Sequence, residues 1–241
     1  MSGNKPLVVL AAGGTAGHVF PAEALATELA ARDFRLTLFT DQRGGAFPGV
    51  LQELDTYRIR AGGVTGKNIP TMFKSGLELA IGLFQARNLL RKVKPSAVVG
   101  FGGYASVPTM LAAYLGIYPT LIHEQNAVLG RANRFLASRV NCIATCFETV
   151  EGLPVAVAGK VKMSGMPVRP SIVDFQNKDY RPITDDGPFH ILVIGGSQGA
   201  RVLSDIVPAS ITTIPEATRR RFQIVQHCRH EDMERVRAAY V

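Results

Sequence analysis

Three glycine-rich loops are the segments of this 241-residue chain whose composition most directly indicates chemistry. They are Gly13-Gly-Thr-Ala-Gly17, Gly100-Phe-Gly-Gly103 and Gly195-Gly-Ser-Gln-Gly199, and each follows an apolar run typical of a buried strand. A glycine turn between a parallel strand and a helix lets the backbone approach a ligand and aims free N–H groups at an anion. The hydroxyls of Thr15 and Ser197 add hydrogen-bond donors. The loops therefore favour a phosphorylated ligand over tight turns alone.

None of these loops matches a complete nucleotide-binding fingerprint. A P-loop needs Gly-Lys-Ser/Thr at a fixed spacing, and no loop has it; none is a full G-x-G-x-x-G either. A nicotinamide dehydrogenase also needs an acidic residue at the end of its second strand. Asp41 meets that requirement, so the dehydrogenase class stays open as an alternative.

Two histidines lie where the ligand of such a fold is expected. His18 closes the first loop, and we interpret it as a catalytic or binding residue rather than a helix cap. His123 ends an apolar run and begins His123-Glu-Gln-Asn126, which brings four polar groups to the carboxyl end of a strand, where ligands bind in open α/β sheets. By contrast, the group formed by His227, Cys228 and His230 has no second pair of ligands, so we predict no metal site.

Predicted strands and helices alternate along the chain, as they must to position these loops. Apolar runs predict strands at 7–12, 36–39, 97–99, 120–123, 142–145, 191–194 and 223–226. Helical periodicity predicts helices at about 21–32, 108–115 and 200–211. This alternation is typical of a parallel sheet covered on both faces, and right-handed crossovers favour a doubly wound α/β fold.

The same patterns predict one complete domain and the start of another. We expect a Rossmann-like domain at 1–165, a linker at 166–187 where periodicity is lost, and the beginning of a second such domain at 188–241. An amphipathic pattern (Met233, Val236 and Tyr240) reaches the last residues with no helix stop signal. We therefore expect the chain to be a fragment.

Five motifs occur in a fixed order along the chain. They are Gly13-Gly-Thr-Ala-Gly-His-Val-Phe-Pro-Ala22, Gly100-Phe-Gly-Gly-Tyr-Ala-Ser106, His123-Glu-Gln-Asn126, Pro167-Val-Arg169 and Gly195-Gly-Ser-Gln-Gly-Ala-Arg201. Together they resemble glycosyltransferase family 28, in particular its UDP-N-acetylglucosamine transferases of peptidoglycan synthesis, over essentially the whole chain. The resemblance implies a GT-B fold, with the acceptor on the N-terminal domain, most of the nucleotide sugar on the C-terminal domain and the active site between them.

The activity implied by this resemblance is an inverting hexosyl transfer. N-acetylglucosamine would move from UDP-N-acetylglucosamine to lipid I, undecaprenyl-pyrophosphoryl-N-acetylmuramyl-pentapeptide, to give lipid II, without cofactor or metal. Family members continue further and carry most of the donor pocket there, so we expect this chain to be inactive by itself. Three alternatives are a split transferase with a partner subunit, another UDP-sugar enzyme such as a glycolipid transferase or epimerase, and a nucleotide-binding module without catalysis.

The resemblance also assigns roles to individual residues. Our first candidate for the general base is His18, and our second is Glu124. Residues at ligand-contacting positions are Thr15, Ala16 and Gly17 of the first loop, Asn126, Arg169 and Ser197 for the donor, and Tyr104, His123 and Glu124 for the acceptor or catalysis. Two residues depart from the family pattern: Ala16 replaces a frequent glycine, and Met166 replaces a frequent asparagine.

Positive charge is concentrated in one part of the chain. The net charge is +8, and the segment 58–94 holds eight basic residues and one acid. Such a patch indicates nucleic acid, a phosphorylated ligand or an acidic membrane, unless it is only a solvated face. Because the implied acceptor is lipid-linked, we expect an anionic membrane surface and no nucleic acid.

An apolar stripe lies within this basic segment. Its members, at helical spacing between Ile69 and Lys94, are Phe73, Leu77, Ala80, Ile81 and Phe84. We expect the stripe to dock the protein peripherally on the cytoplasmic face of the inner membrane; the alternative is an ordinary core-facing helix. The uncharged run 95–122 is interrupted by glycine and proline, so we predict no spanning helix.

Overall fold

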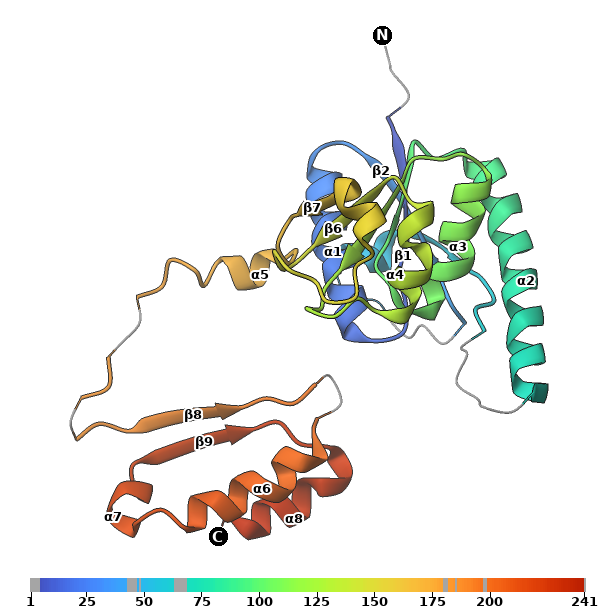
Figure 1. The fold of residues 1–241 in the computed structure, drawn as a ribbon. Coiled ribbons are helices and arrows are strands. Elements are labelled where there is room, and N and C mark those ends of the chain that lie inside the picture. The colour runs from blue at the N-terminus through green and yellow to red at the C-terminus, as the bar shows by residue number, and fades with distance from the viewer. Residues whose placement is uncertain are drawn as a thin grey trace. The chain divides into compact units, whose positions relative to one another are not determined.

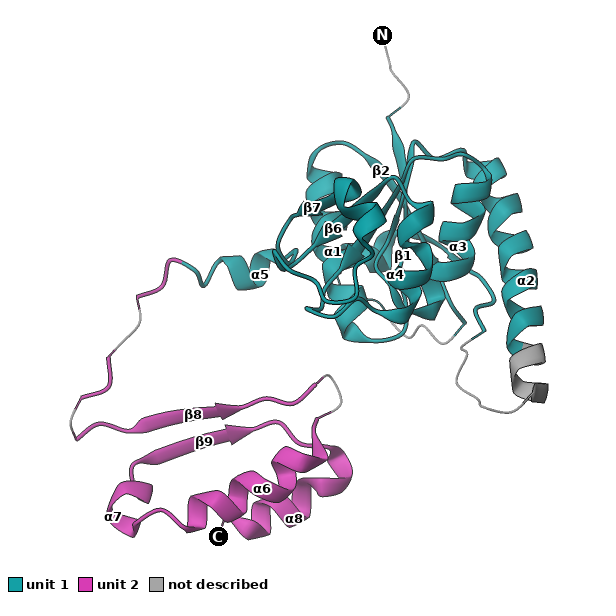
Figure 2. Ribbon diagram, in the orientation of Figure 1, with its two compact units in different colours: residues 1–176 teal, residues 177–241 magenta. Residues whose placement is uncertain are grey.

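The computed structural model describes residues 5–42, 47, 49–62, 69–179, 182–184, 186–196 and 199–240. For residues 69–74 it describes the helix but not the side chains. The chain divides into two compact units, Met1–Gln176 (unit 1) and Asn177–Val241 (unit 2), shown in separate colours in Figure 2. Each unit has its own parallel sheet.

Unit 1 is built on a seven-stranded parallel sheet with the order β3-β2-β1-β4-β5-β6-β7. Its strands are β1 (Leu7–Ala11), β2 (Arg35–Thr40), β3 (Asp55–Arg58), β4 (Ala97–Gly100), β5 (Thr120–Glu124), β6 (Cys142–Thr145) and β7 (Val161–Met163). The strand order reverses between β1 and β4, which pair along Val8–Ala11. Such a reversal opens a crevice at the carboxyl ends of the strands.

Helices cover both faces of this sheet (Figure 1). They are α1 (Ala16–Ala31), α2 (Ile69–Val93), α3 (Gly103–Leu115), α4 (Arg131–Leu136) and the 3₁₀ turns η1 (Gly49–Glu53), η2 (Ala137–Arg139) and η3 (Val155–Lys160); the short α5 (Pro170–Val173) follows the last strand and buries no residue. Alternate residues of β1 face opposite cores: Val9 belongs to the cluster of α2, α3 and α4, and Leu10 to the cluster of α1 and η1. The predicted doubly wound α/β fold is therefore confirmed.

Two helices begin earlier than the sequence predicts. Helical periodicity predicted starts near Pro21 and Pro108, and proline is in general favoured in the first helical turn. Instead α1 begins at Ala16 and α3 at Gly103, and both prolines lie inside their helices. Each helix thus forgoes one backbone hydrogen bond. The early starts bring both helix N-termini directly to the ends of β1 and β4.

The elements absent from the sequence prediction lie mainly at the margins of the sheet. β3 and β7 are the two edge strands; β3 is mostly exposed and polar, and β7 is mostly exposed and only three residues long. Edge strands lack the continuous apolar run that marks a buried parallel strand, so no pattern distinguished them. The short α4 was also missed.

Unit 2 contains one parallel strand pair, β8 (Phe189–Val193) and β9 (Phe222–Gln226). Its other elements are α6 (Arg201–Thr212), α7 (Glu216–Arg219), η4 (His230–Asp232) and α8 (Met233–Ala239). The side chain of Gln226 donates to the Leu203 carbonyl and so faces the helices. Leu192 and Val225 point away from that face and are exposed.

Among the described residues, none of the helices combines the length and apolarity needed to cross a bilayer.

Two glycines of α2 give opposite predictions for stability. A Cβ at Gly82 would lie 1.8 Å from the Arg60 carbonyl oxygen, whereas a Cβ at Gly76 would meet no described atom within 4 Å. We expect Gly82→Ala to lower the free energy of unfolding by about 1–3 kcal/mol through overpacking. The control Gly76→Ala should raise it by about 0.5–1 kcal/mol because alanine has the higher helix propensity. Urea unfolding measures both, and equal effects of the two variants would contradict the packing of α2 on Arg60.

Candidate functional site

The predicted site residues of unit 1 gather at the carboxyl ends of β1, β4 and β5. Ala11, Gly100 and Glu124 end these strands, and the β1–α1 loop, the β4–α3 loop and the segment after β5 follow them. This edge is where the strand order reverses, so the structure brings together segments that are far apart in sequence.

His18 is fixed by contacts with the β4–α3 loop. Its Nδ1 lies 2.8 Å from the carbonyl oxygen of Phe101. Because a carbonyl only accepts, Nδ1 must carry the proton, and in the neutral ring Nε2 is then free to accept one. A general base needs this arrangement.

Two glycines form the surface on which the His18 ring rests. A Cβ at Gly102 would lie 3.4 Å from His18 Cε1, and one at Gly103 would lie 3.2 Å from His18 Cδ2. Both residues have positive φ, +83° and +69°, which L-residues with side chains rarely adopt. Glycine is therefore required at both positions by the backbone as well as by the ring.

The N-terminus of α1 is open to a ligand. Thr15 is its N-cap residue, but its side chain makes no capping hydrogen bond. Thr15 and Gly17 are exposed, and Ala16 is half-buried. The free N–H groups and the positive end of the helix dipole favour an anion here. Ala16 does not have positive φ, so an alanine fits where the family often has glycine.

Glu124 is buried and fully engaged in hydrogen bonds. The residue is 1% exposed. Oε1 accepts from the backbone N and side-chain Nδ2 of Asn126 at 3.0 and 2.9 Å, and Oε2 accepts from Gly130 N and Asn133 Nδ2, both at 2.9 Å. The four donors hold the segment after β5 in one conformation. The two hydrogen bonds to Oε1 also fix the position of the exposed Asn126.

His123 lies beneath the site, 3% exposed. Its Nε2 lies 3.3 Å from the Gly165 carbonyl oxygen and 3.7 Å from Cys146 Sγ. Burial lowers the pKa of His123, and this outweighs the opposing effects of the Gly165 hydrogen bond and the Glu124 charge. The ring is therefore neutral at pH 7.

The other predicted residues are less closely joined. Tyr104 is half-buried in the first turn of α3. The Arg169 guanidinium lies 4.0 Å from the ring centroid of Phe20, a cation–π contact that brings Arg169 to α1. Met166 Sδ lies 3.7 Å from Cys146 Sγ. Ser197 lies outside the described residues.

Sequence reasoning overlooked two residues that the structure places among these groups. Phe20 supports Arg169, and Gln125 donates to the Phe101 carbonyl at 2.9 Å. Both lie inside quoted motifs, Phe20 shortly after His18 and Gln125 between Glu124 and Asn126. An apolar ring or a neutral amide carries no chemical signal of its own, so only their contacts reveal them.

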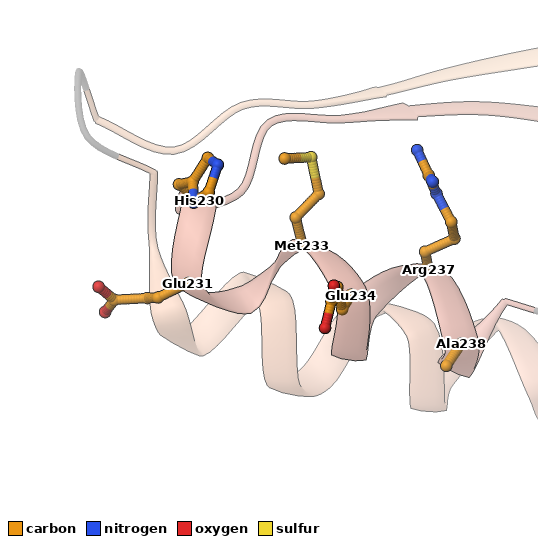
Figure 3. Close-up of a pocket in the computed structure, with 6 residues that line it drawn as sticks. All are labelled: His230, Glu231, Met233, Glu234, Arg237 and Ala238. Atoms are coloured by element: carbon orange, nitrogen blue, oxygen red, sulfur yellow. The ribbon is translucent and has the colours of Figure 1, made fainter.

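Unit 2 has a hollow of its own, along η4 and α8. Figure 3 shows its lining residues: His230, Glu231, Met233, Glu234, Arg237 and Ala238. All six come from one continuous segment, and none is a predicted site residue. Within the described ranges, no three His, Cys, Asp or Glu side chains gather in a way that would hold a metal ion.

Comparisons with known proteins agree on one family. Residues 8–145 match the model of the glycosyltransferase family 28 N-terminal domain. A relative from Paramagnetospirillum magneticum is 55% identical over 240 residues, which cover all of this chain and 65% of the relative. One from Rhodospirillum rubrum is 51% identical over 242 residues, covering 98% of this chain and 61% of the relative. Both are named UDP-N-acetylglucosamine–N-acetylmuramyl-(pentapeptide) pyrophosphoryl-undecaprenol N-acetylglucosamine transferase.

Solved structures show the same fold. MurG from Acinetobacter baumannii matches with a TM-score of 0.68 and 27% identity, over 98% of this chain and 62% of that one. UDP-GlcNAc 2-epimerase from Neisseria meningitidis bound to UDP-GlcNAc matches with a TM-score of 0.57 and 13% identity, over 98% of this chain and 69% of that one. The second likeness concerns the fold alone. The predicted GT-B fold class is confirmed, and the chain spans less than two thirds of the length of the transferases named here.

The four hydrogen bonds to Glu124 predict a large effect of a small change. Glu124→Gln replaces one accepting oxygen by an NH₂ group that faces two donors, whichever way the amide turns. We expect the free energy of unfolding to fall by about 2–3 kcal/mol, the cost of placing a donor against donors at a buried position. Glu148→Gln, at an exposed position, is the control and should change it by less than about 0.5 kcal/mol. Similar urea midpoints for both variants would refute the structural role of Glu124.

Proposed function

This chain belongs to glycosyltransferase family 28, and on that premise we propose that the whole protein transfers N-acetylglucosamine from UDP-N-acetylglucosamine to lipid I, giving lipid II. The names of the relatives at 55% and 51% identity support this substrate pair. The observation that carries the proposal is the exposed N-terminus of α1 beside a histidine whose Nε2 is free to accept a proton. Family membership leaves no support for a dehydrogenase.

His18 acts as the general base in this proposal. Its Nε2 takes the proton of the C4 hydroxyl of N-acetylmuramyl-pentapeptide, and that oxygen forms a bond to the anomeric carbon of N-acetylglucosamine. The bond from that carbon to UDP breaks, and UDP leaves with the electron pair. Attack from the face opposite the leaving group inverts the anomeric centre. Helix N-termini and loop N–H groups stabilise the charge that develops on the diphosphate.

We assign Glu124 to positioning rather than to proton transfer. All four of its hydrogen bonds come from donors within unit 1, and no lone pair faces the solvent side of the site. Asn126, which it holds, remains a proposed donor contact together with Arg169 and Ser197. Tyr104 remains a proposed acceptor contact, and the buried His123 would support the site from below.

The two units would divide the substrates between them. We propose that unit 1 takes the lipid-linked acceptor and that unit 2 contributes to the donor site. Because the relatives are longer than this chain, the activity is proposed for the whole protein. The alternatives are a split enzyme completed by a partner subunit, another UDP-sugar enzyme and a nucleotide-binding module without catalysis. An assay of lipid II formation by the whole protein would distinguish them from this proposal.

A membrane-docking role for α2 rests on its exposed apolar face. Leu77 and Phe84, seven residues apart on one face, are 56% and 66% exposed, and Ala80 between them is exposed too. A wholly core-facing helix would bury this face. Instead, α2 packs on the core through its opposite face, which carries the buried Ala86 and Leu90. The side chain of Phe73 and residue Lys67 lie outside the described part of the chain.

Basic residues surround this face and add to its affinity for anionic lipid. Arg87, Arg91, Lys92 and Lys94 are all exposed on α2 or just after it. Each contributes about 1 kcal/mol near an anionic surface. We propose that Leu77 and Phe84 enter the headgroup region of the cytoplasmic leaflet of the inner membrane, which holds the protein peripherally beside its acceptor.

His18→Ala in the whole protein tests the proposed base. We expect kcat for lipid II formation to fall by about 10²–10⁴-fold, the usual contribution of a positioned general base. KM for UDP-N-acetylglucosamine should change little, because the imidazole acts on the acceptor. Glu28→Ala, at an exposed position of the same helix, should leave kcat unchanged. A kcat within twofold of wild type for His18→Ala would remove His18 from the mechanism.

Sedimentation with phosphatidylglycerol vesicles tests docking. The double variant Leu77→Ser, Phe84→Ser should bind at least about tenfold more weakly, because it removes apolar area that would enter the lipid. Wild-type binding should also fall as salt is raised. Val155→Ser is the control, since Val155 is a 91% exposed apolar residue of unit 1 outside α2. Unchanged binding of the double variant, with the fold intact by circular dichroism, would place the docking surface elsewhere.

A further inference from the structure

The side chain of Gln125 shares a hydrogen-bond acceptor with His18. Gln125 is buried, 8% exposed, and its Nε2 donates to the Phe101 carbonyl oxygen at 2.9 Å. The same oxygen accepts from His18 Nδ1 at 2.8 Å. One backbone carbonyl at the end of β4 therefore joins a side chain from α1 to a side chain that follows β5.

The orientation of the Gln125 amide is fixed by this contact. A carbonyl cannot donate, so the NH₂ group and not Oε1 must face Phe101. Among the described residues, none donates to Gln125 Oε1. The bond to Phe101 is thus the interaction that holds the amide in place.

The peptide between Phe101 and Gly102 needs such a support. Gly102 has φ +83° and no Cβ, so sterics alone permit this peptide to turn over. The turned peptide would present the Gly102 N–H where the Phe101 carbonyl now lies. His18 Nδ1 would then have to accept a hydrogen bond, and Nε2 would carry the proton. A histidine in that tautomer has no lone pair for the acceptor hydroxyl.

We propose that Gln125 is a positioning residue that locks the Phe101 carbonyl toward His18 and thereby keeps the Nδ1–H tautomer of His18. The consequence for catalysis rests on the proposed function of His18 as general base. The predicted tautomer does not depend on that function, because it is a property of the protein without substrate.

Nitrogen-15 NMR of the histidine rings in the 241-residue chain tests the tautomer directly at pH 7.5. We expect His18 of the wild type to be protonated on Nδ1 and unprotonated on Nε2. His18→Gln identifies the His18 signals by their loss. A wild-type His18 protonated mainly on Nε2 would overturn the proposal without any further variant.

Two variants of Gln125 remove the donor with little change of shape. Gln125→Met and Gln125→Leu both lack a hydrogen-bond donor. We expect each that folds to shift at least half of His18 to the Nε2–H tautomer. Thr109→Val is the matched control, because Thr109 is a buried polar residue of α3 whose hydroxyl has no hydrogen-bond partner among the described residues, and it should leave the tautomer unchanged. A wild-type tautomer in a folded Gln125 variant would overturn the proposal.

Kinetics of the whole protein separate this inference from the proposed function. Gln125→Met should lower kcat for lipid II formation about tenfold with little change in KM for UDP-N-acetylglucosamine. A tautomer shift with full activity would leave Gln125 as the lock on Phe101 and would exclude His18 as the base. A loss of activity with an unchanged tautomer would exclude the lock instead.

Discussion

The carbonyl oxygen of Phe101 is the point on which the geometry of the site depends. It accepts from His18 on α1 and from Gln125 after β5, while the Phe101 amide donates to Ala11 of β1 at 3.0 Å. One residue at the end of β4 thus ties together the three strand ends that form the crevice. The reversal of strand order between β1 and β4 makes this possible, because it leaves the loops after the two strands facing one another.

Glycine and buried charge keep this arrangement in place. Gly102 and Gly103 give the His18 ring a backbone surface free of side chains, and their positive φ forms the turn between β4 and α3. On the other side, the buried Glu124 carboxylate accepts four hydrogen bonds from the segment that follows β5. A carboxylate used in this way stabilises the segment that presents Asn126. The site therefore combines one half-buried histidine with surrounding groups whose hydrogen bonds are already made.

Much of this was predictable from the sequence, and the remainder has physical causes. The glycine loops and central strands follow from local composition, and His18 was identified because it closes the first loop. The starts of α1 and α3 were predicted too late in the sequence. Pro21 and Pro108 resemble first-turn prolines, but each helix begins before its proline. The edge strand β3 is too polar, and the edge strand β7 too short, to show a pattern. The roles of Gln125 and Phe20 depend on contacts across 24 and 149 positions of sequence, which no local pattern encodes.

The most direct test of the central claim is a double-mutant cycle between His18 and Gly103, read as kcat of the whole protein. A Cβ at Gly103 would press on the His18 ring, 3.2 Å from Cδ2. The account predicts that Gly103→Ala lowers kcat at least about tenfold when His18 is present and causes little further loss in the His18→Ala background. An equal loss in both backgrounds would contradict it, because Gly103 would then act on the fold and not through His18.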